Sequence, residues 1–128
     1  MRKSLVAGIL TVLLLATALT AEDGKEKKKE PSFWMKKKLS YSQEILNGLA
    51  TEDYELIQKN AMAMKGLNRI EFFVRRKPEG YRTQLKTFQF SVDELVRNAE
   101  DDDLDGATLA FTQMTISCVN CHKVLRKE

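Results

Sequence analysis

Residues 81–106, YRTQLKTFQFSVDELVRNAEDDDLDG, carry the clearest helical pattern of the chain and end in a turn signal. Apolar side chains recur there every three or four positions, which places them on one face of a helix. These side chains are Leu85, Phe88, Val92, Leu95 and Val96. The acidic run at 101–105 and Gly106 then interrupt the pattern, as between two helices. We therefore predict a helix over 81–99 and another over 107–126.

The same period recurs upstream and predicts two more helices, over 32–49 and from Thr51 to the basic run at 75–77. Thr51 is the predicted N-cap of the second of these. The expected inward positions are Met35, Leu39, Leu46 and Leu49, followed by Leu56, Ile57, Met64, Leu67 and Ile70. No segment alternates as a strand does. Four helices with short connections favour an all-α, antiparallel up-down-up-down four-helix bundle, with three helices, one of them broken, as the alternative.

The first residues have the features of an export signal. Arg2 and Lys3 precede an uncharged run of about 15 residues, and small residues end at Ala21. The run is short for a membrane span of about 20 residues, so we predict cleavage rather than permanent membrane insertion, with a retained anchor as the alternative. The expected organisation is a signal peptide at 1–21, a charged leader at 22–31 and one domain at 32–128. The expected location is the periplasm or an equivalent compartment outside the cytoplasm.

Charge gives no indication of a nucleic-acid partner. The chain has 21 basic and 18 acidic side chains, a net charge of +3. Arg2 and Lys3 are the charged residues of the signal, so the mature chain keeps 19 basic and 18 acidic side chains, a net charge of +1. Nucleic-acid-binding domains are usually far more basic.

The chain's two cysteines and single histidine all lie in Cys118-Val119-Asn120-Cys121-His122. On a helix, these spacings bring the two thiols and the imidazole onto neighbouring parts of one face. Two thiols can add across the two vinyl groups of haem, and the histidine can bind the iron from the same side. Cys-x-x-Cys-His is the attachment signature of c-type haem. We predict one covalent haem c, joined by Cys118 and Cys121 and ligated by His122, which requires the c-type haem attachment machinery.

Three other uses of Cys118, Cys121 and His122 fit the sequence less well. A redox Cys-x-x-Cys pair normally follows a strand, and no strand is predicted here. A structural zinc normally takes four ligands, and three are present. A disulfide between the two cysteines would leave the adjacent histidine without a role. The run from Asp101 to Gly106 resembles the opening of a calcium loop, but Thr112 stands where that loop needs a glutamate. Asp103 or Asp105 is expected to be a helix N-cap instead.

The sequence resembles the cytochrome c′ family of four-helix-bundle c-type cytochromes. The resemblance rests on the C-terminal haem motif and on Arg126, a basic residue four positions after His122. It implies that Cys118 and Cys121 hold the haem and that His122 is the proximal ligand. Members of such families transfer electrons or bind small gases, and the fold alone does not choose between these functions.

The predicted topology brings five aromatic residues to the haem end, namely Phe33, Trp34, Phe72, Phe73 and Tyr81. Phe33, Phe73 and Tyr81, with Arg126, are expected in the haem surroundings, where an apolar wall excludes water. Met35 is the candidate distal ligand, and His/Met ligation suits electron transfer. Met62 and Met64 are expected in the core, and Met114 lies on the helix of the proximal histidine. Lys36, Arg75, Arg76, Arg82 and Arg126 are candidates for haem propionates or a docking surface.

The expected function is monohaem electron transfer outside the cytoplasm with a redox partner protein. The alternative is a five-coordinate haem that binds nitric oxide or carbon monoxide. No enzyme is expected, because a peroxidase would need a distal acid-base group and the chain has no second histidine. A homodimer is left open.

Overall fold

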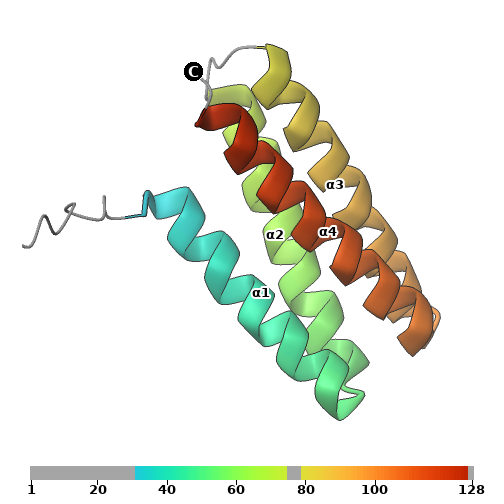
Figure 1. The fold of residues 1–128 in the computed structure, drawn as a ribbon. Helices are drawn as coiled ribbons and strands as arrows, with labels where there is room; N and C mark the ends of the chain where they lie inside the picture. The colour runs from blue at the N-terminus through green and yellow to red at the C-terminus, as the bar shows by residue number, and fades with distance from the viewer. Residues whose placement is uncertain (1–30, 75–78, 127–128) are drawn as a thin grey trace, which may run out of the picture. The chain divides into compact units, whose positions relative to one another are not determined.

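The computed structural model describes residues 31–74 and 79–126, which form four helices: α1 (Phe33–Thr51), α2 (Tyr54–Val74), α3 (Glu79–Glu100) and α4 (Leu104–Leu125). No strand occurs among these residues, so the predicted all-α class with four helices is confirmed (Figure 1). The predicted signal peptide at 1–21 and most of the charged leader at 22–31 lie outside the described residues. No helix within the described ranges is both long and apolar enough to cross a membrane.

The connection between α1 and α2 lies two residues later in the chain than predicted. Helix α1 continues through Thr51, so the prediction of Thr51 as an N-cap is wrong. Glu52 turns the chain with a left-handed backbone, φ 55°. Asp53 then caps α2, because its Oδ1 accepts a hydrogen bond from the Leu56 N–H at 2.9 Å. The carboxylate of Asp53 satisfies one of the backbone donors that a helix start leaves without a partner.

The connection between α3 and α4 also ends in an aspartate that caps the following helix. Asp103 is the N-cap, and its Oδ1 accepts from the Gly106 N–H at 2.9 Å. Helix α4 therefore starts at Leu104, three positions before the predicted start. A Cβ at position 106 would lie 2.4 Å from Oδ2 of Asp103 and 2.7 Å from Oδ1 of Asn98, so a larger residue would displace these side chains, including the capping carboxylate. Asp103 rather than Asp105 is the cap.

The core is built most regularly by α3. All five of its predicted inward side chains are buried, as are Ile57 and Met64 of α2 and Ala107, Ala110 and Met114 of α4. Ile45 supplies the fully buried side chain of α1. The strict three-and-four spacing of α3 leaves only one way to orient that helix against its neighbours.

Several predicted inward positions of the first two helices are wrong. Leu39 and Leu46 are 59% and 55% exposed, Ile70 of α2 is 55% exposed, and Met62 is exposed as well. The inward face of α1 instead passes through Lys38, Ile45 and Gly48. This face is set by α2: a Cβ at position 48 would lie 2.7 Å from Cγ1 of Ile57, so glycine lets the two helices approach closely. The inward face of α2 near Ile70 is taken by the polar residues Asn68 and Glu71.

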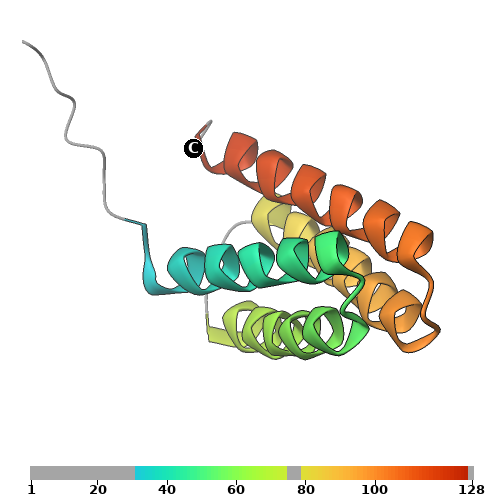
Figure 2. The ribbon, with the colours of Figure 1, turned by 90° about the horizontal axis from the view of Figure 1, so that it is seen from below.

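The helices pack in sequence order. Helix α1 lies beside α2, α2 beside α3 and α3 beside α4, while α1 touches α4 much less (Figures 1 and 2). At one end of α2 and α3, Gln58 of α2 donates to Glu100, the last residue of α3, at 3.0 Å. At the other end, near the start of α3, the Tyr81 hydroxyl donates to Glu71 of α2, and a Cβ at Gly80 would lie 3.4 Å from Val124 of α4. Because Gly80 and Tyr81 lie in the first turn of α3, the last turn of α4 lies near the junction between α2 and α3.

Candidate haem attachment site

The motif Cys118 to His122 lies within the last two turns of α4, which stays helical through Leu125. Both cysteines are free thiols and half-buried, while His122 is exposed. Cys118 packs against the buried core cluster. The unbroken helix fixes the two sulfurs one turn apart and places the imidazole directly after the second of them.

The surroundings hold both thiols in the protonated form. Burial raises the pKa of the Cys118 thiol above its ordinary value, and the Lys38 ammonium partly opposes that rise. Burial likewise raises the pKa of Cys121, again opposed by Lys38, while Glu71 and Cys118 add to the rise. A charge on either thiol is therefore disfavoured by burial, while the charge of Lys38 acts on both thiols and that of Glu71 acts on Cys121.

These residues fit covalent haem. A thiol adds across a vinyl group by giving its sulfur to one carbon and its hydrogen to the other, so two free thiols at this spacing are the required starting state. A disulfide between Cys118 and Cys121 would exclude it, and both are free. The exposed imidazole of His122 is accessible as a nitrogen ligand. In the parts of the chain that the structure describes, no group of three His, Cys, Asp or Glu side chains is arranged to hold a bare metal ion.

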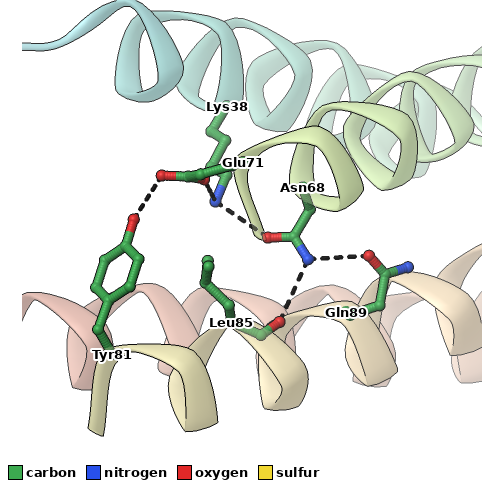
Figure 3. A network of polar contacts seen from close by, with 6 residues as sticks. All are labelled: Lys38, Asn68, Glu71, Tyr81, Leu85 and Gln89. Carbon is green, nitrogen blue, oxygen red and sulfur yellow. Dashed lines mark hydrogen bonds and ion pairs between the residues drawn. The ribbon is translucent and has the colours of Figure 1, made fainter. Parts of the chain in front are cut away.

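Beside this end of α4 lies a buried polar network (Figure 3). Lys38 of α1 pairs with Glu71 of α2, with 2.7 Å between Nζ and Oε2. The Tyr81 hydroxyl of α3 donates to the other carboxylate oxygen of Glu71 at 2.5 Å. Three helices thus meet on one carboxylate that has no exposed surface.

Asn68 extends the network. Its Oδ1 accepts from Lys38 Nζ at 3.3 Å, and its amide nitrogen donates to the Leu85 carbonyl at 3.3 Å and to Gln89 Oε1 at 2.9 Å. The Lys38 ammonium also lies 4.5 Å from the centroid of the Phe88 ring. Lys38 is therefore held on several sides, by a carboxylate, an amide and an aromatic face.

Sequence reasoning missed Lys38, Asn68 and Glu71 as members of a site. A signal was present, because Ile57, Ala61, Met64, Asn68 and Glu71 follow one another at intervals of three and four along α2. Lys38 likewise precedes Ile45 by seven positions. Polar residues that continue an apolar helical face are a mark of a buried polar network.

The predicted aromatic wall is brought together only in part. Tyr81 is buried and joins the network, whereas Phe33 and Phe73 are 62% and 78% exposed. The Phe33 ring contacts Trp34 edge to face at 5.7 Å, and Phe72 contacts Phe73 at 5.9 Å, each pair within its own helix. Arg82 places its guanidinium 4.6 Å above the Phe72 ring. Of the five aromatics, Tyr81 is the one that the structure ties to the residues around the thiols.

The other predicted residues are placed as follows. Met35 is half-buried in the first turn of α1, one turn before Lys38. Arg126 follows the last residue of α4, and its backbone N–H donates to the His122 carbonyl at 3.2 Å while its side chain is exposed. Lys36 and Arg82 are exposed, and Arg75 and Arg76 lie outside the described residues.

Comparisons of the whole chain with protein-family models, with curated proteins and with solved structures found no match.

Proposed function

We propose that the protein is a monohaem c-type cytochrome that transfers electrons outside the cytoplasm. Its haem is carried on Cys118 and Cys121, with His122 as the proximal ligand. The observation that carries the proposal is the pair of free, half-buried thiols one turn apart on α4, followed at once by the chain's only histidine. When bound there, haem supplies a one-electron ferric–ferrous couple.

The protein's own residues have separate tasks. Cys118 and Cys121 tether the cofactor, so that His122 stays close to the iron at high effective concentration. The core around Cys118 excludes water from one side. The exposed edge, near Lys36, Arg82 and Arg126, is the surface proposed to meet a redox partner protein.

The proposal takes the four helices as an antiparallel up-down-up-down bundle of the kind found in the cytochrome c′ family. Two contacts support this order: Tyr81 with Glu71 joins the start of α3 to the end of α2, and Gly80 lies near Val124 at the end of α4. Lys38 with Glu71 adds the first turns of α1 to the same end.

Covalent attachment is tested by producing the full chain with the c-type haem assembly machinery. Intact-mass measurement of exported protein should show one added haem, and N-terminal sequencing should locate the cleavage expected after Ala21. The double variant Cys118→Ala, Cys121→Ala should carry no covalent haem. Val119→Ala is the matched control, since it changes an exposed residue inside the same motif and should keep full loading.

Unmodified mass with both thiols free, or joined to each other, would overturn the proposal.

Met35 is proposed as the distal ligand, on the basis of its half-buried position in the first turn of α1. A low-spin spectrum in both oxidation states that Met35→Ala abolishes would support this ligand and electron transfer. High-spin ferrous protein that binds carbon monoxide rapidly, with no effect of Met35→Ala, would favour the gas-binding alternative.

A further inference from the structure

The ion pair between Lys38 and Glu71 is not explained by the folding of the bundle alone. Glu71 has no exposed surface and the Lys38 side chain is 11% exposed, so both charges have left water. A buried pair gains little net stability over an apolar pair of similar size, because desolvation offsets the attraction between the charges. Leucine or methionine at these two positions would continue the apolar faces of α1 and α2.

The geometry holds the ammonium in one place. Glu71 binds it at 2.7 Å, Asn68 accepts from it at 3.3 Å, and the face of Phe88 lies 4.5 Å from it. Tyr81 fixes the carboxylate by donating to its other oxygen, and Gln89 orients the Asn68 amide (Figure 3). A charge that is held this firmly in a low-dielectric interior acts on nearby groups with little screening.

The nearby groups are the two haem-attaching thiols. Glu71 accepts from Tyr81, and a Cβ at the adjacent Gly80 would lie 3.4 Å from Val124, which is three positions after Cys121 on α4. In agreement with this proximity, the charge of Lys38 acts on both thiols and that of Glu71 acts on Cys121. Any group bonded to both sulfurs lies within the field of this ion pair. Other cations near this end, such as Arg82 and Lys123, are exposed, and solvent weakens their effect.

We propose that Lys38, fixed by Glu71 and Asn68, sets the reduction potential of the haem carried on Cys118 and Cys121. This inference rests on the proposed function. The ferric site carries one more positive charge than the ferrous site, so a fixed ammonium favours the ferrous state and a fixed carboxylate favours the ferric state. The two members of the pair therefore act on the potential in opposite directions.

Paired substitutions test the proposal in the haem-loaded protein, with the midpoint potential measured by optical redox titration. Lys38→Met should lower the potential, and Glu71→Gln should raise it. We expect each change to shift the ferrous-to-ferric ratio at a fixed applied potential by about tenfold, which is about 59 mV for one electron. The double variant Lys38→Met, Glu71→Gln should return toward the wild-type value.

Lys65 supplies a matched control. It pairs with Asp93 at 2.8 Å, but the two side chains are 40% and 42% exposed. Lys65→Met removes the same charge from a screened pair and should leave the potential unchanged.

A structural role would give a different result from the one proposed. If the pair served only to hold the helices, both single variants would lower thermal stability and neither would move the potential in a charge-dependent direction. Loaded variants whose potentials stay at the wild-type value, or shift with the same sign, would overturn the inference while leaving the proposed function intact.

If Lys38→Met fails to fold, the variants Glu71→Gln and Tyr81→Phe test the inference instead. Tyr81→Phe removes the donor that offsets the carboxylate charge, so it should lower the potential. Wild-type protein without covalent haem would instead overturn the proposed function itself.

Discussion

At the scale of single residues, the thiols of Cys118 and Cys121 combine two properties that oppose each other. Their burial keeps them protonated, and the proposed attachment to a vinyl group requires them to be reduced and reachable. Half-burial meets both needs, because Cys118 packs against the core while both residues keep exposed surface that the proposed cofactor could reach. Protonation also protects the pair from oxidation, since the thiolate is the form that attacks a disulfide.

This environment predicts a pH dependence of the haem-free protein. A thiol whose pKa is raised in the folded chain stabilises the folded state while it is protonated. That contribution is complete below the ordinary pKa of 9.0 and is lost as the pH rises through the higher folded-state value. Urea unfolding of the haem-free protein should therefore show stability falling with rising pH in the alkaline range. The double variant Cys118→Ala, Cys121→Ala should lose less over the same range, and equal losses in the two proteins would contradict this account.

At the scale of helices, the two tight turns are formed by aspartates that cap the following helix. Asp53 and Asp103 each accept from the backbone N–H three positions later, at 2.9 Å. Both turns also contain a residue with a left-handed backbone, Glu52 in the first and Asp102 in the second. Neither residue is glycine, so the helical hydrogen bonds and the caps must hold these conformations against a steric cost.

Replacing a cap should therefore be measurable. Asp103→Ala should lower the free energy of unfolding by about 1 kcal/mol, because the Gly106 N–H loses its acceptor. Asp105→Ala is the control: it removes an acidic residue from the first turn of the same helix without removing the cap, and it should have a smaller effect. Chemical denaturation of the three proteins at one ionic strength measures both changes. Equal losses in the two variants would mean that charge, rather than the cap hydrogen bond, stabilises the start of α4.

The helices also show which parts of the fold could be predicted from sequence. The inward face of α3 was predicted correctly because its apolar spacing is regular and the polar residue buried within it, Ser91, is small. The inward face of α1 was predicted wrongly because Leu39 and Leu46 form a plausible apolar face. The face that is actually buried includes Lys38, and a charged residue makes it look exposed in the sequence. A lysine can be predicted to point inward only if the acidic residue that pairs with it is known. The partner of Lys38 is Glu71, which lies 33 positions away on another helix. The Cys-x-x-Cys-His motif, and with it the proposed haem site, could be recognised from five consecutive residues without the fold, whereas the network beside it depends on three helices meeting.

At the scale of the whole molecule, the packing is uneven. Helices α3 and α4 pack extensively, and α1 packs on α2 but little on α4. Leu39 and Leu46 leave α1 with exposed apolar surface. A helix that packs less extensively than its neighbours opens at a lower free energy than the rest of a bundle.

Haem attachment is therefore expected to stabilise α1 most among the four helices. The proposed cofactor would add apolar surface at the end of α4, where the charge of Lys38 of α1 already acts on the thiols, and burial of apolar surface opposes local opening. Hydrogen exchange of the haem-loaded protein should show slower exchange at amides of α1 than in the double variant Cys118→Ala, Cys121→Ala. Amides in the middle of α3, around Val92, are the internal control, because that segment is fully packed in either state. Equal slowing in both helices would indicate a general gain in global stability, and no slowing in α1 would place the cofactor away from that helix. Only the first result agrees with a haem that completes the contact between α1 and α4.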